Sequence, residues 1–154
     1  MSRTGDRGRM RTSILRPLLA VAAISCAAGA AATPPALASP AATKPPVVVI
    51  KTSNLGRVLA TTGKLGLYTW NVEKKAGGKV RCTGACAKAW PPVLVKGPVQ
   101  RRIKGIDATF GTVRRPSGKT QLTVNGLPVY VYEHDAPNVV LCDDVDGWFA
   151  IRQR

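Results

Sequence analysis

The groups that form a catalytic triad are scarce in this 154-residue sequence. Its single histidine, His134, stands between Glu133 and Asp135, and the sequence contains no Gly-x-Ser-x-Gly segment. A triad needs a nucleophile, a histidine base and an orienting acid within reach of one another. Ser53 and Ser117 stand in stretches that read as loops. We therefore predict that the protein is not an enzyme and that His134 is an exposed side chain beside acids.

Acidic residues are also few, with eight Asp and Glu against 23 Lys and Arg and a formal net charge of +15. The basic residues are scattered, as at 74–75, 101–102 and 114–115, and no ladder of aromatic residues alternates with them. Specific nucleic-acid binding is therefore not expected, because it usually combines a basic groove with stacking platforms. We expect anionic cell-wall polymers or a membrane surface as partners. The sequence leaves the oligomeric state open.

No long hydrophobic run occurs beyond the N-terminal region. Residues 1–38 are typical of a signal peptide, with several arginines, an apolar core at 17–32 and an A-x-A cleavage site before Ser39. An alternative is a lipoprotein signal over residues 1–25, because Ser25 precedes a cysteine, Cys26, that would carry the lipid. We expect a secreted or extracytoplasmic protein of the cell envelope, and both the soluble and the lipid-anchored form remain open.

The remaining chain is expected to form one small all-β domain. Residues 39–46 are rich in proline and alanine and predict a flexible linker, so the domain would span 47–154. Short stretches rich in Val, Thr, Tyr or Trp predict strands at 56–62, 66–70, 109–115, 119–125, 128–133 and 148–152. The Asn-Gly pair at 125–126 predicts a tight hairpin turn. No helical stripe is convincing, although residues 83–90 have room for one or two turns.

The domain contains an internal repeat of two similar antiparallel units. "GLYTWNVE" at 66–73 resembles "PVYVYEHD" at 128–135, and each copy then leads to a cysteine and a tryptophan. Two β-hairpin units, each with one apolar face, would bury those faces by packing face to face. Tyr68 and Trp70 in the first copy, like Tyr130 and Tyr132 in the second, are two positions apart. Within each copy both rings therefore share one face of a strand. An inward face makes them core, which we expect, whereas an outward face would make a binding platform.

The predicted mature chain has an odd number of cysteines, Cys82, Cys86 and Cys142. Thiols outside the cytoplasm tend to be oxidised, so we expect a structural disulfide, either between Cys82 and Cys86 or from Cys142 to one of them. A spacing of three residues is unfavourable for a redox pair, and Ala87 stands where haem attachment requires histidine. No cofactor is predicted. The alternative is a zinc or copper site that gathers the three cysteines and His134.

These features resemble a bacterial family of small exported proteins and lipoproteins, a secreted repeat of unknown function with a Tyr-x-(Phe/Trp/Tyr)-x-x-Asp motif. The motif residues here are Tyr68, Trp70, Glu73, Trp90, Tyr130, Tyr132 and Asp135. The block "CTGACAKAWPP" at 82–92 and the segment "RRPSGKTQLTVNGLPVYVYE" at 114–133 extend the resemblance across 56–150. The sequence departs from the family where Glu73 replaces Asp and where the loop around Cys142 differs. The resemblance implies location and domain type and supplies no activity.

The sequence thus favours a noncatalytic binding or scaffolding module at the cell envelope. The alternative is a thiol-redox or metal-binding protein that uses the cysteine cluster.

Overall fold

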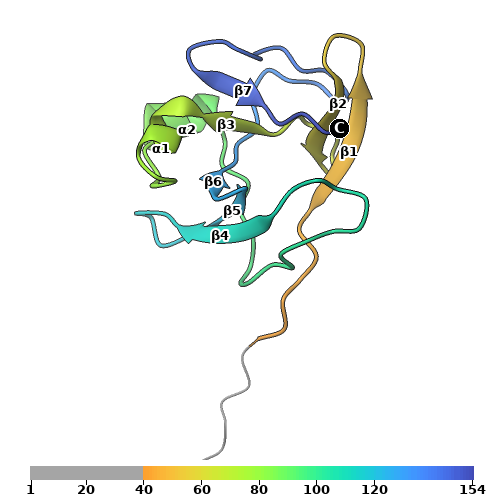
Figure 1. The fold of residues 1–154 in the computed structure, drawn as a ribbon. Coiled ribbons are helices and arrows are strands. Elements are labelled where there is room, and N and C mark those ends of the chain that lie inside the picture. Colours follow the sequence, from red (N-terminus) through yellow and green to blue (C-terminus); the bar gives the residue numbers. More distant parts are fainter. Residues whose placement is uncertain (1–39) are drawn as a thin grey trace, which may run out of the picture. The chain divides into compact units, whose positions relative to one another are not determined.

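The computed structural model describes residues 40–154, so the predicted signal peptide and Cys26 lie outside the described residues. The all-β prediction is confirmed, because short strands dominate this part of the chain and its two helices have five residues each (Figure 1). The elements are β1 Val47–Thr52, β2 Gly56–Thr61, β3 Tyr68–Trp70, α1 Asn71–Lys75, α2 Ala85–Ala89, β4 Phe110–Arg114, β5 Thr120–Val124, β6 Leu127–Pro128 and β7 Trp148–Ala150.

The strands form three small antiparallel sheets, β1–β2, β3–β7 and β4–β5–β6. The Asn125–Gly126 turn joins β5 to β6 with positive φ angles of 50° and 81°, as an Asn-Gly hairpin turn requires. Isolated bridges then link the sheets to one another, including Val58 to Arg152 and Tyr68 to Tyr130. The predicted hairpin is therefore confirmed, and the small sheets are cross-connected.

Alternate residues of the central segments enter two different hydrophobic clusters. Val58, Tyr68 and Tyr130 belong to an aromatic-rich cluster that we call the aromatic core. Their chain neighbours Leu59, Leu67 and Val129 belong to a second, aliphatic cluster around Leu122 and Phe110. Because successive side chains of a strand point to opposite faces, these segments are buried on both faces. This explains why they are continuously apolar and do not alternate between apolar and polar residues.

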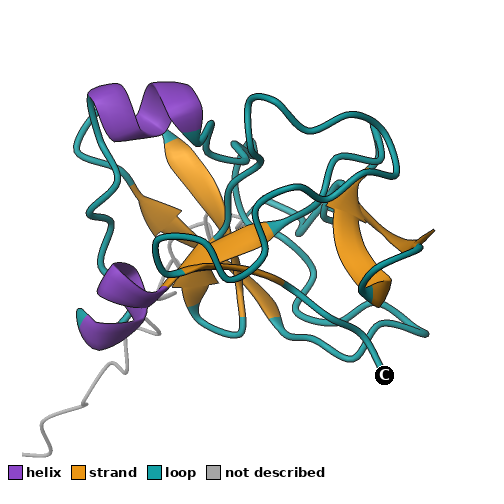
Figure 2. Cartoon of the chain, turned by 90° about the horizontal axis from the view of Figure 1, so that it is seen from above, coloured by secondary structure: helices purple, strands orange, loops and turns teal. Residues whose placement is uncertain are grey.

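Both helices lie on the side of the domain away from the β1–β2 hairpin (Figures 1 and 2). Helix α2 falls within the stretch 83–90, where the sequence had room for one or two turns. Helix α1 was not predicted, because five residues are too few to produce a periodic apolar stripe. Within the part of the chain that the structure describes, no helix is long and apolar enough to cross a membrane.

Two segments differ from their predictions. The strand expected at 128–133 is reduced to β6 and single bridges from Tyr130 to Tyr68 and Pro92. Beyond Tyr130 alternate residues keep an antiparallel register with 89–91, with Val131 donating to the Pro91 carbonyl and Glu133 to the Ala89 carbonyl. The ladder is incomplete because Pro91 and Pro92 have no N–H to donate in return. In the predicted linker 39–46, Thr43 pairs with the segment 98–100 through two backbone hydrogen bonds of 3.0 and 2.8 Å. Ordered packing therefore begins before β1.

Candidate functional site

The two repeat copies meet directly at their tyrosines. Tyr68 and Tyr130 exchange both backbone hydrogen bonds, at 2.9 and 3.0 Å, across an antiparallel bridge. The sequence predicted two hairpins packed face to face, but the structure joins the copies edge to edge. An antiparallel pair of this kind has a local twofold axis between the two residues. The surroundings of the two tyrosines follow that approximate symmetry.

The aromatic contacts obey the same twofold relation. In each copy the tyrosine meets the tryptophan edge to face at 5.2 Å, as Tyr68 with Trp90 and as Tyr130 with Trp148. The two tryptophans stack on each other at 3.9 Å with an interplanar angle of 8°. Trp70 covers the outer side of Trp148 at 5.2 Å, and the corresponding Tyr132 lies 4.7 Å from Trp90. Tyr68 and Tyr130 are fully buried, and the half-buried Trp70 and Tyr132 pack against the same cluster, so these four motif rings belong to the core.

The acid of each motif binds the tyrosine of the other copy. The Tyr68 hydroxyl donates to Asp135 and the Tyr130 hydroxyl donates to Glu73, both at 2.7 Å. Each acid also accepts hydrogen bonds from backbone N–H groups of its own cysteine loop. Glu73 accepts from Arg81 and Cys82, and Asp135 accepts from Leu141. The motif therefore has a structural use. Its tyrosine and its acid complete two crossed hydrogen bonds, and neither copy forms them alone.

Burial raises the pKa values of the two paired tyrosines and of Asp135. Burial and the hydrogen bond to Asp135 raise the pKa of Tyr68 far above its ordinary value of 10.0, and burial with the bond to Glu73 does the same for Tyr130. Burial and a contact with the Cys142 thiol raise the pKa of Tyr132. Burial also raises the pKa of Asp135, against the opposing effect of the hydrogen bonds it accepts.

The sequence contains three tyrosines. We expect all three to stay protonated until the domain unfolds. Below pH 10 both states keep the phenolic protons, so stability is unaffected there. Above pH 10 the unfolded chain releases them first, so stability falls as the pH rises. Phenolate absorbance should thus appear in one cooperative step together with loss of the near-ultraviolet dichroism. A gradual titration centred near 10 in the folded domain would contradict the buried crossed pairs.

The cysteines do not form one cluster. Cys82 and Cys86 form a disulfide with an S–S distance of 1.99 Å, while Cys142 is a half-buried free thiol. His134 is exposed and lies 3.6 Å from Glu133. Within residues 40–154 no group of three or more His, Cys, Asp or Glu side chains is arranged to hold a metal ion. The alternative ligand set of the sequence is therefore not brought together, since oxidised Cys82 and Cys86 are not ligands.

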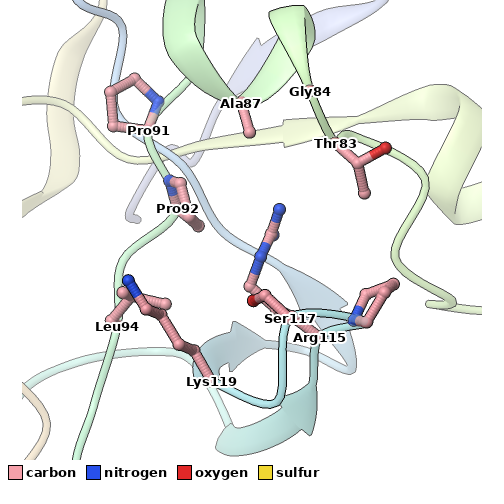
Figure 3. A pocket seen from close by; sticks show the side chains of 10 residues that line it. Thr83, Gly84, Ala87, Pro91, Pro92, Leu94, Arg115, Ser117 and Lys119 are labelled. Carbon is pink, nitrogen blue, oxygen red and sulfur yellow. The ribbon is translucent and has the colours of Figure 1, made fainter.

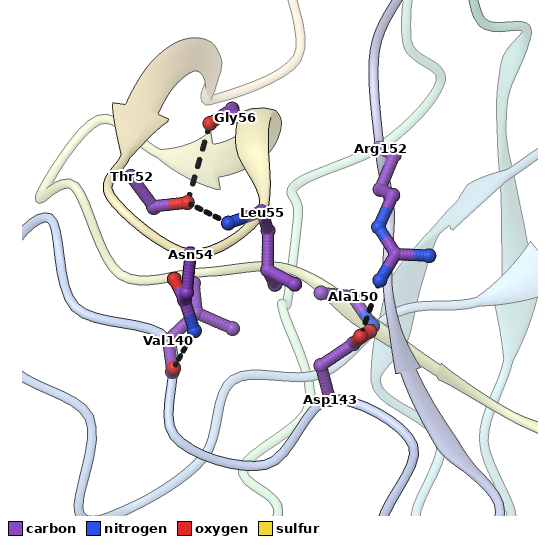
Figure 4. Close-up of polar contacts among 8 residues, drawn as sticks. All are labelled: Thr52, Asn54, Leu55, Gly56, Val140, Asp143, Ala150 and Arg152. Carbon is purple, nitrogen blue, oxygen red and sulfur yellow. Dashed lines mark hydrogen bonds and ion pairs between the residues drawn. The ribbon is translucent and has the colours of Figure 1, made fainter.

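The second cysteine loop is tied to β1–β2 and to the C-terminal segment (Figure 4). Asn54, in the β1–β2 turn, donates to the Val140 carbonyl at 3.5 Å. Asp143 accepts from the Ala150 backbone N–H at 2.9 Å and from Arg152 at 2.6 Å. Asp143 thus acts as a local salt-bridge partner and braces the loop that carries Cys142.

A hollow of about 510 Å³ opens between the first cysteine loop and the β4–β5 turn (Figure 3). Its apolar surface comes from Ala87, Pro91, Pro92, Leu94 and Pro116. The volume is within the range of small-molecule sites, about 300–1,000 Å³. We call it the Arg115 pocket, because the Arg115 side chain projects into the space between the prolines and Thr83 (Figure 3).

Arg115 is a buried cation with neutral partners. It is 7% exposed, and its guanidinium donates to the Cys82 carbonyl at 2.7 Å and to the side-chain carbonyl of Gln121. Among the described residues no carboxylate lies within 4.0 Å of it, and none lines the pocket. Lys119 adds a second positive charge at the rim. The buried carboxylate of Glu73 binds the same two residues as Arg115, through the Cys82 N–H and the Tyr130 hydroxyl, but it makes no direct ion pair with the guanidinium. A guanidinium has five N–H donors, so Arg115 retains donors for an anion that binds it directly.

The repeat symmetry breaks at this pocket. Each hairpin turn donates a side chain to a cysteine-loop carbonyl, with Asn54 binding Val140 O and Arg115 binding Cys82 O. At the first contact Leu55 packs against the aromatic core. At the second contact Pro116 and Arg115 border an open space. Sites where a symmetric framework departs from its symmetry are candidates for function, because packing alone does not require the difference.

Sequence reasoning missed Arg115, which it grouped with the scattered basic residues. The signals available were the turn "RPSGK" and the block "WPP", which the structure brings to opposite walls of the pocket. Neither segment identifies the other from sequence. The burial of Arg115 depends on contacts with Cys82 and Gln121 that are distant in the chain or hidden in the core.

One of the comparisons with known proteins found a match to part of the chain. A family model described as "Secreted repeat of unknown function" matches residues 49–94. This span begins within β1 and runs past Trp90 and Pro92, so it covers one complete copy of the repeat. The searches for curated proteins and for solved structures found no match to the chain. The family resemblance noted in the sequence is thus confirmed for residues 49–94, which are similar to the secreted repeat of that family.

Proposed function

We propose that this protein is a noncatalytic, exported binding module that holds an anionic group of an envelope polymer in the Arg115 pocket. The observation that carries the proposal is the buried guanidinium of Arg115, whose hydrogen-bond partners are neutral. A buried charge without a carboxylate partner is costly. A carboxylate or phosphate of a ligand would supply the missing counter-charge with strong, charge-assisted hydrogen bonds.

The rest of the pocket fits a ligand with an uncharged body. The three prolines and Leu94 offer apolar contacts, and the Thr83 and Ser117 hydroxyls offer hydrogen bonds around them. Lys119 at the rim favours the approach of an anion. The lining contains no histidine, free thiol or carboxylate that would serve as a general base. These features support binding over catalysis.

The proposed location follows from the secreted family and the predicted leader. Anionic polymers are abundant where an exported bacterial protein resides. Without the five arginines and the aspartate of the leader, the chain keeps 23 − 5 = 18 basic and 8 − 1 = 7 acidic residues, and this net charge of +11 favours their approach. Release by cleavage after Ala38 or anchoring through lipidated Cys26 would both place the domain there. The intact mass of the exported protein distinguishes the two forms.

Binding should depend on the pocket more than on total charge. We expect the Lys119→Gln domain to bind galacturonate or glycerol phosphate about two- to fivefold more weakly than the wild type, at about 150 mM salt. Lys104→Gln is the matched control, because it removes the same charge from an exposed position outside the pocket. Titration calorimetry measures both variants. Equal losses for the two would show that diffuse charge, and no specific pocket, attracts the anion.

A further inference from the structure

The Arg115 pocket continues into a second hollow. This hollow, of about 390 Å³, is lined by Leu94, Val95, Lys96, Lys119 and Thr120. Leu94 and Lys119 line both hollows, so the two are adjacent and share a border. We call the combined surface the basic groove.

Backbone pairing sets the direction of the basic groove. Leu94 bridges Gln121 in an antiparallel sense, and the Val95 N–H donates to the Thr120 carbonyl at 3.0 Å. The segment that follows the two prolines therefore runs beside β5, and the hollows succeed one another along it. Three cations accompany the groove: Arg115 in the first hollow, Lys119 at the border and Lys96 in the second.

The surface between the charges is apolar and free of aromatic rings. Leu94 is 42% exposed at the border of the hollows, so it offers an apolar contact to a bound ligand. No aromatic residue lines either hollow. Sequence-independent binding of single-stranded nucleic acid relies on stacked aromatics, which neither hollow provides. Cations separated by apolar contacts suit a polymer whose anionic groups are separated by uncharged units.

We infer that the basic groove binds a linear anionic glycopolymer, in which carboxylate or phosphate groups are separated by uncharged sugar or polyol units. One anionic group pairs with Arg115 and the next lies between Lys119 and Lys96, while the linking unit covers Leu94. This inference rests on the proposed function of the Arg115 pocket and extends it from a single group to a chain.

The test compares monomers with short oligomers on the mature domain. The probes are galacturonate and its oligomers for carboxylate, and glycerol phosphate and its oligomers for phosphate, at about 150 mM salt. We expect at least one oligomer series to bind about tenfold or more tightly than its monomer, because the second contact is intramolecular. Lys96→Gln should remove most of that gain, whereas the distant Lys104→Gln should change neither monomer nor oligomer binding.

The outcomes separate the two levels of the proposal. If monomers bind in a Lys119-dependent manner but oligomers gain nothing, or if Lys96→Gln behaves as Lys104→Gln does, the groove inference is wrong and the single pocket stands. If monomer binding ignores Lys119, the proposed function itself fails. Single-stranded DNA that binds as tightly as the oligomers under the same conditions would also overturn the choice of a glycopolymer. The series that shows the gain identifies the anionic group as carboxylate or phosphate.

Discussion

Replacing Glu73 with alanine is expected to lower the free energy of unfolding by about 3 to 5 kcal/mol. Glu73 has no exposed surface, and its Oε1 accepts from the Tyr130 hydroxyl and from the N–H groups of Arg81 and Cys82. Each of these donors would lose its partner in a site where water does not replace it. The loss is large because one oxygen joins the two repeats and holds the disulfide loop together. Chemical denaturation followed by tryptophan fluorescence measures it.

Two further variants make this result specific. Glu73→Gln retains an acceptor oxygen and places an amide where Oε2 is buried without a partner, so we expect a smaller cost of about 1 kcal/mol. Glu133→Ala removes an exposed acid and should change stability by less than about 0.5 kcal/mol. Comparable stability for Glu73→Ala and Glu133→Ala would be incompatible with the crossed pairs as the link between the copies.

Removing the Trp90 ring is expected to be as damaging. Trp90 is 9% exposed and contacts Tyr68, Tyr132 and Trp148, so it occupies the centre of the twofold aromatic arrangement. Trp90→Ala would leave a large cavity there and should cost about 3 to 5 kcal/mol in the free energy of unfolding. Thermal or denaturant unfolding measures this cost.

A milder variant keeps the prediction testable if Trp90→Ala does not fold. Trp90→Phe retains part of the ring volume and should preserve the fold, while it removes the contribution of the Trp90–Trp148 stack to the circular-dichroism couplet and leaves that of the Trp70–Trp148 stack. Val72→Ala, at a position 45% exposed on α1, serves as the control and should change stability by less than about 0.5 kcal/mol. An unchanged couplet in Trp90→Phe would show that Trp90 does not stack on Trp148.

Much of the framework could be predicted because its signals are local. The alternating Val, Thr and Leu residues of 119–125 predict a strand, and the Asn-Gly pair after it predicts a turn, and both are present in the structure. The similarity between 66–73 and 128–135 indicated a repeat. The manner in which the copies join was not predictable, because edge-to-edge pairing and face-to-face packing bury the same residues. Long-range backbone hydrogen bonds decide between them.

The candidate site was largely beyond sequence reasoning. Arginine is rarely buried, so Arg115 in a basic chain reads as one more solvated charge. Its burial results from two hydrogen bonds, one to the Cys82 carbonyl 33 positions earlier in the chain and one to the Gln121 side chain 6 positions later. The hollow itself results from the angle at which two unrelated loops meet. No periodicity or spacing in the sequence encodes that angle.

The most direct test of this account is an NMR titration of the ¹⁵N-labelled mature domain with the oligomers named above, following the side-chain Nε–H signal of Arg115. The titration is carried out at about 150 mM salt. We expect that signal and the backbone signals of Thr83, Gly84 and Lys119 to shift together and to reach saturation as oligomer is added. The signals around Asn54, in the other turn, should stay in place. Shifts spread over exposed lysines, with Arg115 unmoved, would contradict a binding site built on the buried guanidinium.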